Sequence, residues 1–162
     1  LIIGAVLEPD FTVRHIVAEN KQERDRMRGS KYVQSDTGTI YSQIKQYLKQ
    51  DKYVMFVGAP CQTAGLLQFL GKPYKNLLTV DFLCHGWPSN SFFKEHIKNS
   101  ENRINKRIQS YSFRSKVFGW MPADITSVEV RNMKKKYKFQ LQSFFSFFAN
   151  NYSLRPSCFN CK

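Results

Sequence analysis

"YVMFVGAPCQTAGLLQFLGKPYKNLLTVDFLC", residues 53–84, is the stretch of sequence that decides the fold. It opens on an almost wholly apolar run, residues 53–58, which is typical of a strand buried on both faces of a sheet. Residues 60–70 predict a helix, with Pro60 in its first turn, where proline is favoured. Residues 76–84 predict a second strand. A strand, a helix and a strand in this order form a βαβ unit, which predicts two parallel strands in one sheet.

The segment before this unit predicts further strands. Residues 1–20 read as two strands joined by the turn-forming residues 8–10, and residues 21–29 read as a short charged helix ending at Gly29. Next comes a short predicted strand that ends in a helix cap at Ser35 or Asp36. The helix that follows has apolar residues at helical spacing: Ile40, Ile44, Tyr47 and Leu48.

The second half of the chain has a different pattern. After a predicted helix at residues 91–99, three segments alternate and are rich in residues that favour strands: 107–120, 124–132 and 136–142. They predict an antiparallel extension with a hairpin around Asn132 and Met133. The aromatic-rich segment "SFFSFFANNYSL" predicts a last helix. We therefore predict an α/β fold for residues 1–162: a single domain with a central mixed sheet, a βαβ unit and an antiparallel β extension.

The charge of the chain limits its partners. Its 162 residues carry a formal charge of +13, which favours anionic partners. The densest basic run, residues 131–138, is more typical of a solvated hairpin tip than of a binding surface. No apolar run approaches the ~20 residues needed to span a bilayer, and no named nucleic-acid motif is present, so we expect neither a membrane span nor a nucleic-acid partner. Because no signal peptide opens the chain, we expect a cytoplasmic protein with reduced thiols.

The four cysteines are the strongest chemical signal. Cys61 and Cys84 each follow a predicted parallel strand, so both are expected at the edge of the sheet where the carboxyl ends of such strands meet and ligands bind. Cys61 also lies at a helix N-terminus, which favours the thiolate. Cys158 and Cys161 form a C-x-x-C pair that can reach one metal centre. Four thiolates suit a structural zinc or an iron–sulfur cluster, but buried apolar cysteines have the same appearance at the first two positions.

Two other segments carry possible chemistry. "GSKYVQSD", residues 29–36, combines Lys31 with a predicted helix start, which can hold a phosphate; a simple capped loop is the alternative. His85 can act as a ligand or a proton donor, or it can simply hydrogen-bond a neighbouring loop. Trp87 and Pro88 either shape the wall of a crevice or belong to the core.

The stretches "RGSKYVQSD", "GAPCQTAGL", "DFLCHGWPS" and "LRPSCFNCK" occur in this order, together with "FRSKVFGW". They resemble the motifs of the coenzyme F-420 hydrogenase/dehydrogenase beta-subunit family along nearly the whole chain, and most closely its bacterial members from polysaccharide-biosynthesis contexts. The resemblance implies an oxidoreductase that binds FAD and one or more [4Fe–4S] clusters. Such proteins pass electrons between cluster, flavin and a hydride acceptor such as the deazaflavin coenzyme F-420.

Carried over onto this sequence, the resemblance implies particular site residues. The cluster ligands are Cys61, Cys84, Cys158 and Cys161. The flavin-associated residues are Gly29, Ser30, Lys31, Tyr32, Gln34 and Ser35. No catalytic residue is implied. The basic charge suits a redox partner protein such as a ferredoxin-like donor, or an anionic small-molecule acceptor.

Two departures from the family pattern lead to further expectations. The chain lacks the Ser-Gly-Gly helix that normally precedes the first strand and the segment that normally follows the C-x-x-C pair. We therefore expect a fragment of a longer iron–sulfur flavoprotein, truncated at both ends, in which either cofactor can be absent. A zinc-bound or degenerate non-redox module with a basic binding surface remains the alternative. Without a metal, the stretch around Cys158 and Cys161 is expected to have no fixed structure.

Overall fold

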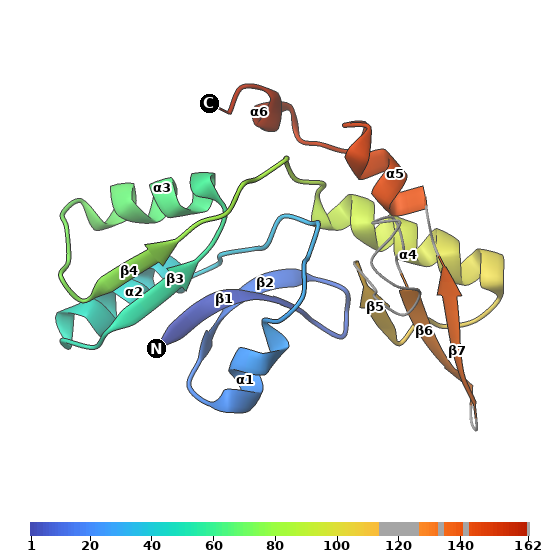
Figure 1. Cartoon of the computed structure of the whole chain (residues 1–162), viewed down its shortest axis with the longest axis horizontal. Helices are drawn as coiled ribbons and strands as arrows, with labels where there is room; N and C mark the ends of the chain where they lie inside the picture. The colour runs from blue at the N-terminus through green and yellow to red at the C-terminus, as the bar shows by residue number, and fades with distance from the viewer. Residues whose placement is uncertain (114–126, 133–134, 141–142, 162) are drawn as a thin grey trace.

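The computed structural model describes residues 1–113, 127–132, 135–140 and 143–161. Its centre is a four-stranded mixed sheet with the strand order β2-β1-β3-β4 (Figure 1). The strands are β1 Ile2–Leu7, β2 Val13–Ala18, β3 Val54–Val57 and β4 Leu77–Val80. β1 pairs antiparallel with β2, whereas β3 runs parallel to both β1 and β4. The mixed sheet and the parallel strands of the βαβ unit are therefore confirmed.

Two helices, α2 Ile40–Lys49 and α3 Pro60–Leu70, pack on one face of this sheet. Their apolar residues recur at helical spacing and meet the strands in a first hydrophobic cluster, which consists of Ile3, Ile40, Ile44, Leu48, Val54, Phe56, Leu66 and Leu70. α3 begins at Pro60 as predicted and ends at Leu70, before Gly71, whose φ of 70° suits a residue without a Cβ. Full burial of one such aliphatic side chain contributes about 1.5–3 kcal/mol, so this cluster is what holds the βαβ unit together.

The opposite face of β1 contacts the end of the short helix α1 Lys21–Arg26. A Cβ on Gly4 would lie only 3.1 Å from the sulfur of Met27, so the strand and the helix end approach closely. The side chain of Asn20 caps α1 by accepting a hydrogen bond from the backbone N–H of Glu23 at 2.9 Å. The two predicted strands and the charged helix are thus present in the predicted order.

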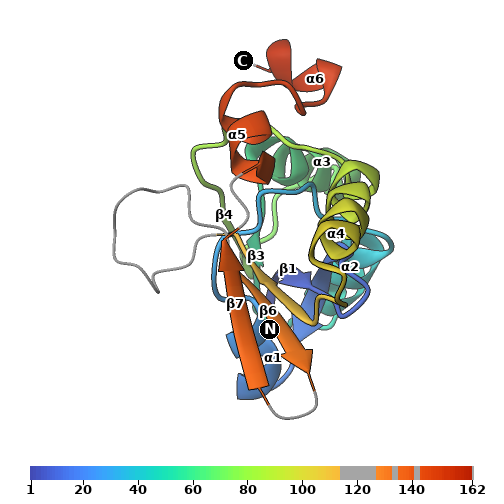
Figure 2. The ribbon, with the colours of Figure 1, turned by 90° about the vertical axis from the view of Figure 1, so that its right-hand side faces the viewer.

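The second half contains the helices α4 Asn90–Ile104, α5 Ser143–Ala149 and α6 Pro156–Phe159 and the strands β5 Ser110–Ser112, β6 Ser127–Asn132 and β7 Lys135–Gln140. The strands form a separate antiparallel sheet, which confirms the predicted extension (Figure 2). Residues 114–126 of the predicted segments lie outside the described residues. A second hydrophobic cluster joins this half to the start of β2 and consists of Val13, Val33, Phe93, Ile97, Ile108, Tyr111, Phe113 and Phe144. The predicted hairpin is confirmed by the pairing of β6 with β7, but its turn, residues 133–134, lies outside the described residues.

The strand predicted at residues 30–36 is wrong. Only an isolated bridge forms there, between Arg14 and Asp36. The backbone N–H of Gln34 instead donates to the carbonyl of Pro88 at 3.0 Å, so this segment is shared between β2 and the loop after β4. Asp36 does accept a hydrogen bond from the backbone N–H of Gly38 at 2.8 Å, but it does not cap the helix, since Thr39 precedes α2 and no side chain caps it.

The strand predicted at residues 76–84 is shorter than expected. β4 ends at Val80, and residues 81–89 have no regular secondary structure. β4 is the edge strand of the sheet, so no described strand on its outer side extends the ladder. Cys84 therefore lies on an irregular loop four residues beyond the strand.

Candidate functional site

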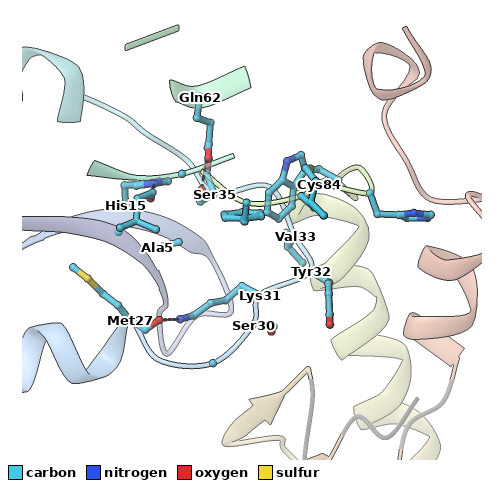
Figure 3. Close-up of a pocket in the computed structure, with 18 of the residues that line it drawn as sticks. Ala5, His15, Met27, Ser30, Lys31, Tyr32, Val33, Ser35, Gln62 and Cys84 are labelled. Carbon is cyan, nitrogen blue, oxygen red and sulfur yellow. Dashed lines mark hydrogen bonds between the residues drawn. The ribbon is translucent and has the colours of Figure 1, made fainter. Parts of the chain in front are cut away.

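A crevice of about 700 Å³ lies between the sheet and the second half of the chain. Its volume is within the range of small-molecule and cofactor sites. β1, β2 and the end of β3 form one side, whereas residues 29–33, Ser35, residues 82–87 and Phe148 of α5 form the others (Figure 3). Two loops with no regular structure thus meet over the sheet, and side chains far apart in the sequence line one space.

The structure brings most of the predicted flavin-associated residues into this crevice. Five of the six line it: Gly29, Ser30, Lys31, Tyr32 and Ser35. Tyr32 also packs on Phe148 of α5, with ring centroids 4.9 Å apart. Gln34 does not line the crevice, because its backbone and side chain are bound to neighbouring loops.

Lys31 is held by backbone carbonyls. Its ammonium donates to the carbonyl of Met27 at 2.7 Å, to that of Arg28 at 3.2 Å and to that of Arg26 at 3.5 Å (Figure 3 shows the first). Burial lowers the pKa of Lys31 to about 8. The three bonds close the end of α1, where unpaired carbonyls attract a cation. The helix start that we expected to assist a phosphate is not adjacent, because α2 begins at Ile40.

Gln62 of α3 fixes the opposite side of the crevice, and we did not predict it. Its amide donates to both the carbonyl and the hydroxyl of Ser35 at 3.0 Å, and its side-chain oxygen accepts from the N–H of Ala59 at 3.1 Å. The signal was available, since a glutamine three residues after a helix cap can reach back to the cap. Gly58 is needed beside it because a Cβ there would lie 2.7 Å from the Phe56 ring.

His15 of β2 also lines the crevice and was not predicted either. The ring stacks on Phe56 with centroids 5.1 Å apart and planes 15° apart, and its Nε2 lies 3.0 Å from the carbonyl oxygen of Val57. Burial lowers the pKa of His15, so the neutral ring is favoured. No sequence signal distinguishes this histidine from any other residue on a half-buried strand.

The loop after β4 supplies the remaining wall. Trp87 lines the crevice and meets Phe82 edge to face, with centroids 6.0 Å apart. The ring of His85 contacts that of Phe148 at a centroid distance of 5.0 Å. Gly86 has a φ of 132°, and a Cβ on it would lie 2.7 Å from Leu154. This loop is therefore packed between the crevice and the C-terminal segment.

The four cysteines are all free, and one of them, Cys84, lines the crevice. Cys61 stands in the first turn of α3. Burial raises the pKa of the Cys84 thiol, and the charges of Cys61, Cys158 and Cys161 raise it further, while a backbone hydrogen bond with Gly86 opposes them. The other three cysteines are therefore near enough to Cys84 to affect its thiol electrostatically. In the described part of the chain, however, no three His, Cys, Asp or Glu side chains converge on a position for a single metal ion.

The C-terminal cysteines lie on and just after a short helical turn, α6, which differs from the irregular segment that we expected. Pro156 starts this turn, and the N–H of Cys158 closes it by donating to the carbonyl of Arg155 at 2.9 Å. The N–H of Arg155 donates to the carbonyl of Trp87 at 3.1 Å, and its guanidinium donates to the side-chain oxygen of Gln34. Arg155 therefore links the C-x-x-C pair to both loops of the crevice.

Comparison with protein families identifies the class of protein. Residues 51–162 match the family model that describes the C-terminal region of the coenzyme F420 hydrogenase/dehydrogenase beta subunit. This range is more than half of the chain, and the chain belongs to this family, whose description is that of oxidoreductase-type enzymes. The segment 29–36 lies outside the matched range. No curated protein matches the chain. Within the described residues, none of the helices is long and apolar enough to cross a membrane.

Proposed function

We propose that this protein is an iron–sulfur flavoprotein oxidoreductase in which the four cysteines hold a [4Fe–4S] cluster and the crevice holds the flavin of FAD. The observation that carries the proposal is the position of Cys84, which belongs to both places. Its side chain lines the crevice, and its thiol interacts with the other three cysteines. A cluster bound at Cys84 would therefore be a direct neighbour of a ring in the crevice.

The donor set fits a cluster. Four free thiols are the ligand set of a [4Fe–4S] centre. A four-iron cluster takes one thiolate at each corner, so its ligands stand farther apart than those of one ion.

The crevice suits the ring of a flavin. Its side chains are mainly apolar and aromatic, with a few polar groups, as is typical of cofactor sites. When bound, the cluster supplies single electrons and the flavin passes a hydride to an acceptor such as a deazaflavin coenzyme. The chain's own residues bind and position: Tyr32 and Phe148 form an apolar wall that excludes water, and Gln62 holds Ser35 in place.

The charge of the chain indicates the kind of electron donor and acceptor that we propose. The formal charge of +13 favours association with an acidic ferredoxin-like protein or an anionic small-molecule acceptor. We further propose a cytoplasmic location, because free thiols and an oxygen-sensitive cluster persist in a reducing compartment.

The test is the visible spectrum of the protein purified without oxygen, together with its iron, sulfide, zinc and flavin content. We expect a broad shoulder near ~400 nm from iron–sulfur charge transfer and the absorption peaks of oxidised flavin. A colourless protein that contains zinc would overturn the proposal and leave a structural module. A protein with neither metal nor flavin under these conditions would indicate a degenerate member of the family.

A further inference from the structure

The two edges of the central sheet differ in how they are covered. β2 forms one edge, and a later segment bonds to its outer side: the N–H of His15 donates to the carbonyl of Asp36 at 2.8 Å, and the N–H of Asp36 donates to the carbonyl of Val13 at 2.9 Å. β4 forms the other edge, and no strand among the described residues pairs with its outer side. Its residues, Leu77–Val80, include neither a charge nor a proline, which are features that keep an exposed edge from pairing. The β4 edge is therefore open to another strand.

The outer side of β4 presents backbone groups that can pair. The carbonyls of Asn76 and Val80 accept hydrogen bonds from the β3 side, at 2.9 and 3.1 Å. Because backbone groups alternate in direction along a strand, those of Leu77 and Thr79 point outward. The N–H of Leu77 donates to the carbonyl of Tyr74 at 3.3 Å in the preceding turn. The N–H of Thr79 is thus the outward donor of the strand, and the carbonyl of Leu77 is an outward acceptor.

The side chains of β4 leave apolar surface uncovered on one face of the sheet. Leu77 packs against the first hydrophobic cluster, below α2 and α3. Successive side chains point to opposite faces, so Leu78 and Val80 lie on the other face, where they are 54 % and 39 % exposed. Phe82 and Leu83, just after the strand, are exposed as well. Burial of this surface against a partner would favour association.

The charges at the two ends of β4 favour pairing of this strand with itself. Lys75 precedes the strand and Asp81 follows it; both are exposed, and neither forms an ion pair within the described residues. When two copies pair antiparallel, the residues with outward backbone groups must face each other. The register with Leu77 opposite the second copy's Thr79 meets this condition, and it also places each Lys75 opposite an Asp81. A shift of two residues in either direction would set Asp81 opposite an uncharged residue.

We propose that this protein forms a symmetric dimer through the β4 edge, in which the two β4 strands pair antiparallel with Leu78 on the two-fold axis. The pairing joins the four-stranded sheets of both copies into one continuous sheet. In each copy the N–H of Thr79 donates to the carbonyl of Leu77 in the other copy. Because only one short edge is buried, the dimer is a weak one that dissociates on dilution. The inference does not depend on the cluster or the flavin.

Sedimentation velocity measures this association in the 162-residue protein, purified without oxygen and kept in reductant so that no disulfide joins two copies. The concentration is raised to about 0.3 mM, at which a dimer of sub-millimolar dissociation constant is populated. We expect a reversible equilibrium between monomer and dimer. Thr79→Pro removes the outward N–H, and an edge strand accepts proline where its N–H faces solvent. Two hydrogen bonds per dimer are lost, so the dissociation constant should rise about thirtyfold. Thr79→Val keeps the N–H and should dimerise normally.

Reversal of the exposed charges tests the register. Lys75→Glu places two pairs of acidic side chains opposite each other, and Asp81→Lys places two pairs of basic ones, so each variant alone should dimerise about tenfold more weakly. An equal mixture of these two variants has complementary charges at both ends of the pairing and should form a heterodimer as tightly as the unmodified protein dimerises. Lys98→Glu, the same change of charge at an exposed position of α4, is the control and should have no effect.

Every other result counts against the proposal. A monomer at all concentrations would overturn it and leave the edge to a strand of another protein. A dimer that Thr79→Pro does not weaken would overturn it too, because another surface would then hold the two copies. If the mixture of Lys75→Glu and Asp81→Lys stays as weak as each variant alone, the proposed register is wrong. The circular dichroism spectrum should be the same in all variants; if Thr79→Pro alters it, the exposed charge variants decide alone.

Discussion

The two pairs of cysteines are supported in different ways. Cys61 is carried by α3, which buries Leu66 and Leu70 against the sheet in the first hydrophobic cluster. Cys158 and Cys161 are carried by α6 and the residues after it, a single turn with no buried residue. Cys61 therefore depends on the burial of apolar surface, whereas Cys84 lies on the irregular loop after β4. The second pair depends on a few hydrogen bonds made by Arg155 and on the packing of Leu154 against Gly86.

We infer from this difference that the two parts of the proposed site become ordered in different ways. The sheet half supplies a preformed edge, with Cys61 at a helix start and Cys84 in the crevice wall. The C-terminal turn is an attached piece whose remaining order would come from the cluster itself, because metal binding energy contributes to folding of such segments. The variants below test whether the two pairs act as one site despite this unequal support.

The largest expected effect is the loss of the cluster. In protein purified without oxygen, Cys84→Ala and Cys158→Ala should each remove most of the iron and sulfide, since a [4Fe–4S] centre uses all four thiolates. Ser157→Ala, on the same turn as Cys158, is the control and should keep its iron. If Cys84→Ala loses the cluster but Cys158→Ala keeps it, Cys158 contributes no ligand and the proposed four-cysteine site is wrong.

A second, smaller effect concerns the stability of the sheet half. Leu66 has no exposed surface, so Leu66→Ala should lower the free energy of unfolding by about 2–5 kcal/mol. Leu67, the next residue of α3, is 48 % exposed, and Leu67→Ala should change it by less than about 1 kcal/mol. Urea denaturation followed by circular dichroism measures both. Equal effects of the two substitutions would mean that the first cluster does not support Cys61 as described.

The third effect concerns the attachment of the C-terminal turn. Arg155→Ala removes the hydrogen bond to Gln34, and a hydrogen bond of this kind contributes about 1 kcal/mol. In the absence of metal, the rate at which iodoacetamide alkylates Cys158 should therefore rise about fivefold, the factor that corresponds to this free energy. The rate at Cys61 in the same molecules is the internal control and should not change.

A variant of the opposite sign sharpens this test. Gln34→Glu would replace the neutral acceptor with a carboxylate for the same guanidinium, and charge-assisted hydrogen bonds are stronger. Alkylation of Cys158 should then become slower than in the unmodified protein. Equal alkylation rates of Cys158 in Arg155→Ala and Gln34→Glu would show that Arg155 does not hold the turn.

The sequence predicted the elements that rest on strong local patterns. The apolar run at residues 53–58, Pro60 and the helical spacing of Ile40, Ile44 and Leu48 are each enough to define an element, and all of these elements are present. The prediction of a strand at residues 30–36 was wrong because their hydrogen bonds go to Pro88 and Gln62, which are distant in the sequence.

In the candidate site, too, the sequence did not predict contacts between residues that are distant in the chain. The motif around Lys31 pointed to the crevice, but the partners of its ammonium are carbonyls at the end of α1, which no spacing rule specifies. His15 was missed because its importance comes from two long-range contacts, the stack on Phe56 and the bond to Val57.

The last expected effect is the pH dependence contributed by Lys31, which lines the crevice. Burial lowers its pKa to about 8 from the ordinary 10.5, so between these values the unfolded chain binds more protons than the folded protein. The contribution of Lys31 to the free energy of unfolding should therefore rise as the pH increases from about 8 to about 10.5, and it should be constant below that window. Lys31→Met lacks this titration. Urea denaturation at several pH values across and below this window measures the unfolding free energy of both proteins. Their difference isolates the titration of Lys31 from that of the other lysines and tyrosines. The carbonyls of Met27 and Arg28 accept from the ammonium and act in the opposite direction. A difference that stays flat or falls with pH would show that these carbonyls outweigh burial, and that the charged form is what closes the end of α1.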